Sequence, residues 1–359
     1  MKTPSNDLFR LIKTLTGAEK MYFKKVAGTH RAEDNNRYLQ LFDAIEKQEE
    51  YNEEEILKKF KGTALAKFLP QQKKYLFSLV LKTLSQFHSK KSSDALLIEL
   101  LKNIEILFNK GLLDLCSKKI EIAKEMAEKY EQFAYLLAIL EWEEKTFFQK
   151  NKQEADKYLN KTIPAAEKLL VKYQTFFETR RMLTQLRVAI LKSGKSISKK
   201  TEKNVALYLS KTSVTMDFYI AKDNFYQIQT LYYKFIKKNY LETKKITENR
   251  ISLAEQFPHM IKEYTVRYAY SLHYLIMDLI RTKQFEEAKV IVDKFRGLIS
   301  DKNIRLSAGT SAVYLNSELS LFIETENFVG GTIFIGENIS KINTTIKNLG
   351  VNDDHRAVI

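Results

Sequence analysis

Apolar residues recur along this chain at intervals of three and four positions, a spacing that places them on one face of an α-helix. The clearest example has apolar residues at Ile261, Tyr264, Tyr268, Leu272, Leu275, Ile276 and Leu279. A polar break, Thr282-Lys283-Gln284, then precedes Phe285, and a second apolar face follows at Ala288, Ile291, Val292 and Phe295. Two helices joined by so short a break pack antiparallel, so this segment predicts a helical hairpin.

Similar breaks recur at a nearly constant interval. They fall near Leu112, Gln153, Ile197, Tyr240, Phe285 and Phe328, which are 41, 44, 43, 45 and 43 residues apart. A single hairpin lacks the neighbours it needs to bury its apolar face, so such units occur in arrays. We therefore predict about six stacked hairpins of roughly 43 residues over 91–350, followed by a C-terminal tail, 351–359.

The turn TKQFEEAKVIVDKF resembles the junction between the two helices of a tetratricopeptide repeat. Phe285 and Ala288 stand where that family has an aromatic and a small residue. The resemblance implies an all-α fold in which antiparallel hairpins coil into a right-handed superhelix, an α-solenoid. The period is longer than the usual 34 residues of that family and its Trp and Gly signature is absent, so the hairpins are expected to be long and degenerate.

Residues 1–90 lie outside this period, and we predict that they form an N-terminal helical cap domain. Thr16 and Glu19 form a capping box, and Asn52 begins another helix. The segments 52–60 and 71–87 also suit a DNA-reading helix-turn-helix whose second helix begins with Gln71, Gln72, Lys73 and Lys74. The opening LIKTLTGAEKMYFKKVAG and the later YLQLFDAIEKQEEYNEEEILKKF are similar to the start of a group of uncharacterised bacterial helical-repeat proteins, a resemblance that implies no activity.

Composition agrees with an all-α chain. Only 11 Gly and 4 Pro are present among 359 residues, too few for the turns of a sheet protein. We predict no sheet of three or more strands, and we predict helix even for the β-branched run 332–335. With 44% hydrophobic and 29% charged residues, we expect a folded protein. No apolar run is long enough to span a bilayer and the start of the chain has no signal-peptide stretch, so we expect it in the cytoplasm. Cys116 is the only cysteine, and we expect its thiol to be buried.

The net charge of +15 is concentrated in the middle of the chain. Residues 151–250 carry 21 Lys and Arg against 9 Asp and Glu. Such an excess attracts nucleic acid or an acidic protein surface, although a solvated Lys-rich face without any ligand gives the same count. We predict a solvent-facing patch that meets an acidic partner, formed by Arg180, Arg181, Arg187, Lys192, Lys195, Lys199 and Lys200.

Two aromatic stripes run through residues 216–240. Phe218, Phe225 and Tyr232 recur every seven residues, and Tyr219, Tyr226, Tyr233 and Tyr240 recur beside them. Three interpretations remain open: packing between helices, a groove for a peptide, or stacking of single-stranded bases with lysines on the phosphates. We predict that the first stripe is buried, and that the partner-binding residues are Tyr219, Tyr226, Tyr233, Lys222, Lys234, Arg180, Arg181 and Arg187.

No arrangement of residues indicates catalysis. The five histidines are scattered, and His259 with Glu263 supplies only two of the three or four ligands that a zinc site needs. We therefore predict no enzyme activity, no cofactor and no metal, and a scaffold that binds a protein or peptide on a concave face. The alternative is a nucleic-acid-associated regulator, or one resembling bacterial peptide-responsive regulators, that uses the N-terminal helices or the basic middle segment.

Overall fold

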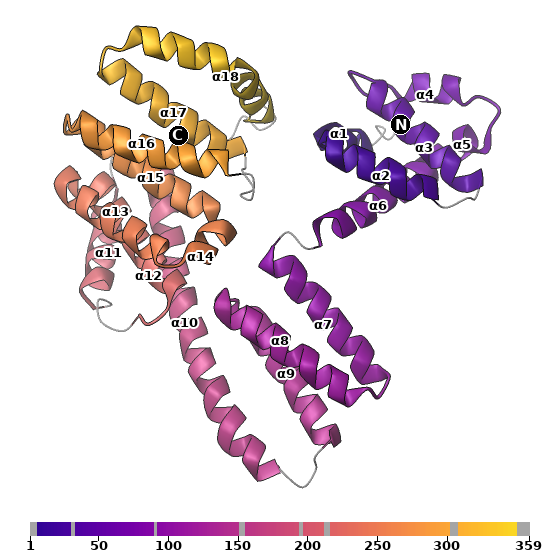
Figure 1. Cartoon of the computed structure of the whole chain (residues 1–359), viewed down its shortest axis with the longest axis horizontal. Helices are drawn as coiled ribbons and strands as arrows, with labels where there is room; N and C mark the ends of the chain where they lie inside the picture. Colours follow the sequence, from indigo (N-terminus) through magenta and orange to yellow (C-terminus); the bar gives the residue numbers. More distant parts are fainter. Residues whose placement is uncertain are drawn as a thin grey trace. The chain divides into compact units, whose positions relative to one another are not determined.

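The computed structural model describes residues 6–29, 33–89, 92–150, 155–193, 197–211, 216–301 and 308–349. Within these ranges the chain forms eighteen α-helices and one π-helical segment, with no strand (Figure 1). The all-α prediction is confirmed there, and residues 332–335 are helical. None of the helices in these ranges combines the length and the apolar character that crossing a bilayer would require. The chain divides into two compact units, residues 1–102 and 103–359.

The first unit is a bundle of short helices around an apolar core. Two of its rings, Phe23 and Phe42, are fully buried and stacked with their centroids 4.6 Å apart. The unit contains α1 (Asp7–Thr14), α2 (Gly17–Thr29), α3 (Glu33–Lys47), α4 (Glu53–Lys59), α5 (Ala64–Lys67), α6 (Leu69–His88) and the beginning of α7 (Ser93–Asn109).

Both predicted helix starts in this unit are confirmed. The Thr16 N–H donates to Glu19 Oε2 at 2.8 Å, and the Glu19 N–H donates back to Thr16 Oγ1 at 3.3 Å. Asn52 Oδ1 accepts from the first turn of α4. Lys73, however, is buried on α6, where its Nζ donates to Glu53 and to the Tyr51 hydroxyl. The Lys73 ammonium group is therefore not available to contact DNA, whereas Gln71 and Lys74 at the start of the same helix are exposed.

The second unit is a series of longer helices. Consecutive helices pack against each other in α8–α9, α9–α10, α12–α13, α15–α16 and α17–α18, and next-but-one contacts join α10–α12, α13–α15 and α15–α17 (Figure 1). The helices are the end of α7, α8 (Leu113–Lys129), α9 (Phe133–Lys150), α10 (Ala155–Ser193), α11 (Lys199–Lys211), α12 (Tyr219–Leu231), the π-helical η2 (Tyr232–Lys237), α13 (Tyr240–Glu255), α14 (Pro258–Glu263), α15 (Thr265–Arg281), α16 (Phe285–Ser300), α17 (Ala308–Glu324) and α18 (Phe328–Leu349).

Four of the predicted breaks are followed within a residue by a new helix. The breaks near 112, 240, 285 and 328 precede α8, α13, α16 and α18. The expectation of six separate hairpins is wrong around α10, because this helix continues unbroken for 39 residues and packs against α9 as well as α11 and α12. Between 155 and 193 no polar break interrupts the helical pattern, and Pro164 alone does not end the helix. The break near Gln153 lies outside the described residues.

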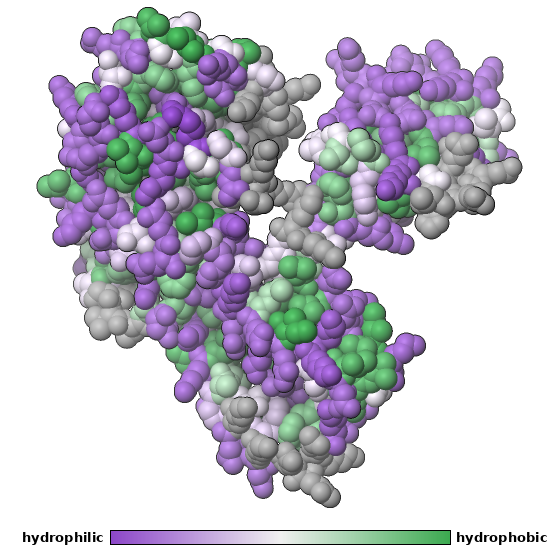
Figure 2. Space-filling model, viewed as in Figure 1, coloured by the Kyte–Doolittle hydropathy of each residue, from purple (hydrophilic) through white to green (hydrophobic). Residues whose placement is uncertain are grey.

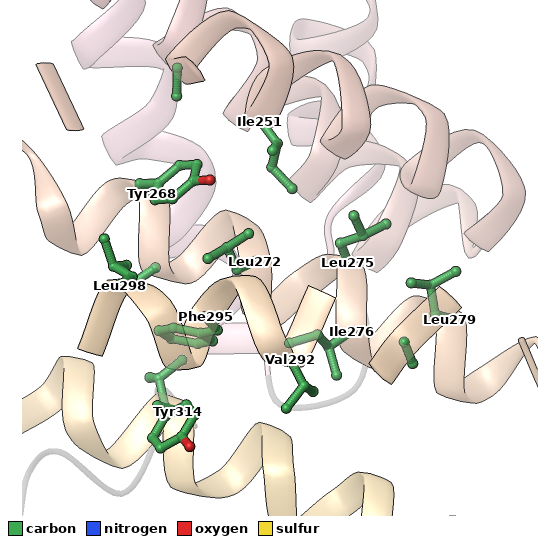
Figure 3. Packing of buried hydrophobic residues seen from close by; sticks show 14 of the residues in the cluster. Ile251, Tyr268, Leu272, Leu275, Ile276, Leu279, Val292, Phe295, Leu298 and Tyr314 are labelled. Carbon is green, nitrogen blue, oxygen red and sulfur yellow. The ribbon is translucent and has the colours of Figure 1, made fainter. Parts of the chain in front are cut away.

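The predicted hairpin of residues 259–300 is observed as α15 and α16, with α14 as a separate short helix before Tyr264. Its core is apolar: Leu272, Ile276 and Phe295 are fully buried (Figure 3). Phe295 faces Tyr314 of α17 edge-on, with ring centroids 5.4 Å apart. The same apolar cluster therefore continues from α15 and α16 into α17.

Candidate binding site

The two aromatic stripes differ less in burial than the sequence suggested. Phe218 and Tyr232 are buried as predicted, but Phe225 is only half-buried. In the second stripe Tyr226 and Tyr233 are half-buried, whereas Tyr219 is only 4% exposed. The expectation that Tyr219 is accessible is wrong, because its ring begins α12 inside the core and packs against Phe257, with centroids 5.5 Å apart.

The predicted basic residues fall into two groups. Arg180, Arg181 and Arg187 are exposed on α10, together with Lys192 on the same helix and Lys199 and Lys200 on α11, while Lys195 lies outside the described residues. Lys222 is half-buried, and Lys234 is only 7% exposed. Lys234 was expected at the surface and is instead in the interior, so it is not an accessible contact for a partner.

A buried charged network lies between α12, α13 and α15. At its centre is Asp223 of α12, which is 2% exposed. Arg250 of α13 donates from Nε to Asp223 Oδ1 at 2.7 Å and from Nη2 to Oδ2 at 3.3 Å. Arg267 of α15 donates from Nη1 to the same Oδ2 at 2.7 Å. One carboxylate thus binds two guanidinium groups from two other helices.

Asn224 extends this network to α10. Its Oδ1 accepts from Arg267 Nη1 at 2.7 Å, and its Nδ2 donates to Thr179 Oγ1 at 3.1 Å. Both Asn224 and Thr179 are fully buried. A continuous set of hydrogen bonds therefore joins four helices, and in a poorly solvated interior such bonds are strong only while every member keeps its partners.

The electrostatics of the network favour the ionised form of Asp223 despite its burial. Burial alone would raise the pKa of the Asp223 carboxyl, but Arg250 and Arg267 outweigh this effect and hold the pKa below its ordinary value. Arg187 of α10 lies within electrostatic range of the same groups. Desolvation lowers the pKa of Arg187, and the positive charge of Arg267 lowers it further.

The π-helical segment η2 carries a second buried pair. Lys234 Nζ donates to Asp278 Oδ1 of α15 at 2.9 Å and lies 4.7 Å from the centre of the Tyr274 ring. Burial lowers the pKa of Lys234 and raises that of Asp278. π-helical turns inside helices are frequent at functional sites, and this one gives way to α13 through Lys238, whose φ is +54°.

His273 lies beside this pair on α15. Its Nδ1 is 2.8 Å from the hydroxyl of Ser317 on α17. Desolvation and the charge of Lys234 lower the pKa of His273 to about 4, so the imidazole is neutral near pH 7. A neutral histidine at this place extends the polar interior from α12 to α17 without adding charge.

The other potentially reactive side chains, Cys116 and His259, take part in packing and hydrogen bonding within the fold. Cys116 is fully buried, as predicted, with its Sγ 3.4 Å from Thr146 Oγ1. His259 Nε2 lies 3.1 Å from the Lys129 carbonyl oxygen. Among the described residues no group of three or more potential ligands surrounds a possible metal position.

Apolar side chains are also exposed on the second unit. Figure 2 shows them over the region of α7–α9, where Ile106, Leu115 and Ile122 are 45%, 47% and 46% exposed. They alternate with charged residues such as Lys118 and Glu121. Scattered exposed apolar residues are ordinary on protein surfaces, so we do not assign a site to them.

The sequence did not identify the charged network in advance. One signal was present: Asp223, Asn224, Gln227 and Thr230 are polar at positions that share a helical face with buried residues. Arg250, Arg267 and Asp278 carry no comparable signal, because single charges within helical sequences are common. Their convergence depends on how α12, α13 and α15 pack.

Comparison with known proteins gives no family for this chain. No family model, no curated protein and no solved structure matches it.

Proposed function

We propose that this protein is a non-catalytic binding scaffold that holds a peptide or a protein segment on the surface formed by α10, α12, α15 and α17. The observation that carries the proposal is the charged network beneath that surface. It fixes α10, α12, α13 and α15 together through Asn224 and Asp223, while Arg187 stays exposed and Arg267 stays partly exposed. Buried charges cost free energy, so stability alone does not account for this network.

We further propose that α7–α18 form a right-handed superhelix like that of tetratricopeptide repeats. Two observations support it. Helices begin at intervals near 43 residues, and contacts join several consecutive pairs such as α12–α13, α15–α16 and α17–α18, and the next-but-one pairs α10–α12, α13–α15 and α15–α17. The curvature of such an array creates an extended concave surface for a ligand. We propose that α12, α15 and α17, the first helices of their hairpins, line this surface.

A selection from a random peptide library tests this function. We expect the chain to enrich peptides, and we expect the bound peptides to slow amide hydrogen exchange in α10, α12 and α15 more than in α16 and α18. Enrichment of no peptide, or protection confined to α16 and α18, would contradict the proposal.

Binding of nucleic acid is the competing function, favoured by the charge of residues 151–250. Duplex and single-stranded oligonucleotides can be added to the same chain at increasing salt. Oligonucleotide binding that is tight at low salt and falls steeply as salt increases would favour a nucleic-acid-associated regulator. We expect Lys73 to contribute nothing to such binding, because it is buried in the N-terminal unit, so any oligonucleotide affinity should come from the exposed basic residues of α10 and α11.

A further inference from the structure

A cleft of about 400 Å³ lies between α16, α17 and α18 of the second unit. Asp223 and its two arginine partners are not among the described residues that line it. Its lining combines aromatic rings with charged groups: Tyr314, Phe322 and Phe334, and Arg296, Glu318 and Glu337. A volume of this order accommodates a small molecule or a single side chain.

Glu318 of α17 brings a buried carboxylate to this cleft, and one of its oxygens lacks a donor. The side chain is only 4% exposed. Oε1 accepts from Arg296 Nη2 of α16 at 2.5 Å, whereas Oε2 is buried without a hydrogen-bond partner among the described residues. Buried polar atoms in this state are uncommon, and they call for an explanation such as a missing water, ion or ligand. Oε2 can therefore accept a hydrogen bond from a donor outside the chain.

Three aromatic rings form a wall beside this carboxylate. Tyr314, one helical turn before Glu318, packs against Phe295 and Phe334, with ring centroids 5.4 and 6.2 Å apart (Figure 3). Phe322 lies 5.8 Å from Phe334 between ring centroids. Burial and the neighbouring Glu318 raise the pKa of Tyr314 to about 12, but its hydroxyl forms no hydrogen bond to Oε2 in the described structure. The faces of aromatic rings attract cations, so the wall and the carboxylate favour the same kind of ligand.

The cleft also carries an excess of negative charge. Of the described residues that line it, Arg296 is the only cation, against the carboxylates of Glu318 and Glu337. Arg296 also donates to Asp293 Oδ1 at 2.6 Å, so its charge is shared between two carboxylates before Glu337 is counted. In a chain of net charge +15 this negative excess is local. It repels an anion from the cleft and attracts a cation.

We propose that this cleft binds a protonated primary amine on a short alkyl chain, either a free alkylamine or the side chain of a lysine. The ammonium group donates to Glu318 Oε2, and the alkyl chain lies against Phe322 and Phe334. An ammonium group has three donors, and its hydrogen bond to a carboxylate is charge-assisted and therefore stronger than a neutral one. The cleft is separate from the surface of α10, α12 and α15, so this site does not rest on the proposed function.

A primary amine fits these groups better than other cations do. A metal ion such as Ca²⁺ needs six or more oxygen ligands, and the described part of the chain offers no cluster of even three acidic, histidine or cysteine side chains that could hold one. A quaternary ammonium group suits the aromatic rings, but it has no N–H to donate to Glu318 Oε2. The combination of a buried acceptor and an aromatic wall therefore favours an ammonium group that carries hydrogen.

The test uses three small probes and variants of the full chain. The probes are n-pentylamine, which is protonated at pH 7, the neutral 1-pentanol and the quaternary pentyltrimethylammonium ion, each titrated with the chain and followed by ligand-observed NMR. The first variant is Glu318→Gln, which keeps the size of the side chain. The matched control is Glu324→Gln, which removes the same charge from an exposed position of α17 that lines a different cavity. Thermal unfolding of each variant checks that it folds.

We expect the natural chain to bind n-pentylamine about tenfold more tightly than 1-pentanol and about threefold more tightly than the quaternary ion. Glu318→Gln should weaken binding of the amine by about tenfold or more, and Glu324→Gln by less than about twofold. No binding of the amine, equal binding of amine and alcohol, equal or tighter binding of the quaternary ion, or equal losses in the two variants would overturn the proposal.

A second variant keeps the test decisive if Glu318→Gln does not fold. Glu337 is exposed, so Glu337→Gln should leave the fold intact and weaken binding of the amine by about threefold through the lower negative charge of the cleft. Unchanged affinity in this variant would contradict the proposal. A Gly-Lys-Gly peptide with blocked ends distinguishes the two sources of the amine: tighter binding than that of n-pentylamine assigns the cleft to a lysine side chain, and weaker binding assigns it to a free alkylamine.

Discussion

The two units of this protein differ in what they bury. The interior of the N-terminal unit is apolar around α1–α6, with Phe23, Leu41, Phe42, Ile45 and Leu76 fully buried. The second unit has an equally apolar cluster at α15 and α16, but a few residues away along α15 it buries Asp278, and on α12 and α13 it buries Asp223 and Arg250. Both interiors are helical, but among the described residues the first unit buries one charged side chain, Lys73, at its edge, whereas the second buries the ion pairs Arg250–Asp223 and Lys234–Asp278.

This difference indicates where to look for recognition. An apolar core stabilises a fold through burial alone and needs no partner beyond the chain. Buried ion pairs often contribute less to stability than apolar residues of similar volume would, although losing one partner is expensive. The charged region of α12, α13 and α15 is therefore the part of the molecule whose composition stability alone does not explain.

The largest effect is expected from removing the centre of the network. Asp223→Ala should lower the free energy of unfolding of the second unit by about 3 to 5 kcal/mol, because Arg250 would be left buried without its counter-ion. Chemical denaturation measures the loss. The matched control is Asp293→Ala, which removes a 68%-exposed carboxylate that pairs with Arg296, and it should cost less than about 1 kcal/mol. Similar losses for both variants would show that the network contributes no more to the free energy of unfolding than an exposed ion pair does.

Two tyrosines of one stripe provide the next comparison, since they differ in burial but not in chemistry. Tyr219→Ala should cost about 3 to 5 kcal/mol, as expected for a large side chain that is 4% exposed. Tyr226→Ala, seven residues later and half-buried, should cost about half as much. Thermal and chemical unfolding of the two variants measures the difference. Equal and large losses would remove Tyr226 from any ligand surface.

The two units should also differ in how their stability depends on pH. His273 has an ordinary pKa near 6.5 in the unfolded chain and a pKa of about 4 in the folded protein. Between these values only the unfolded chain binds the proton, so stability falls as the pH decreases from about 6.5 to 4 and does not fall further on this account. The loss is on the order of 3 kcal/mol for this shift. Unfolding of the natural chain and of His273→Gln at pH 7, 5.5 and 4 measures it, and parallel curves would contradict it.

The N-terminal unit should respond only at lower pH. Burial alone would raise the pKa of Glu19 and Glu53, but hydrogen bonds and the nearby His88 and Lys73 hold both values below the ordinary 4.5. Their contribution to stability is therefore present above pH 4.5 and is lost as the pH falls through the lower, folded-state values.

The smallest effect on stability is expected at the exposed arginines of α10. Replacing Arg180, Arg181 and Arg187 together by Gln should change the free energy of unfolding by less than about 0.5 kcal/mol for each position. Denaturation measures stability, and the affinity for a library-selected peptide measures binding. Unchanged peptide affinity in the triple variant would remove this patch from the binding surface.

Much of the fold was predictable because helices follow local rules. The capping box at Thr16, the N-cap Asn52 and the breaks before Tyr240, Phe285 and Phe328 each depend on a few neighbouring residues, and each is observed. Helix continuity was harder to judge: α10 runs through a position where the period suggested a hairpin. The 43-residue period predicted the spacing of helix starts, but it did not predict whether one helix or two lie between successive starts.

The charged interior was not predictable for a physical reason. Lys234 is predicted at the surface, but residues 232–237 form a π-helix and the Lys234 ammonium group donates to Asp278, 44 residues away. Tyr219 looked accessible from its hydroxyl group, but its surroundings come from Phe257 and Glu131, which lie far away in sequence. Burial of single side chains depends on such distant neighbours, which one sequence does not reveal.

Glu131, in the turn between α8 and α9, also affects how the chain folds. Its two carboxylate oxygens accept the backbone N–H groups of Tyr219 and Ile220 at 2.6 and 2.7 Å, and they cap the first turn of α12 from 88 residues away. Helix ends normally fray, but this one is held by a residue from another hairpin. The beginning of α12 thus gains its cap only when two segments 88 residues apart have met, and contacts of such separation are of the kind that slows folding.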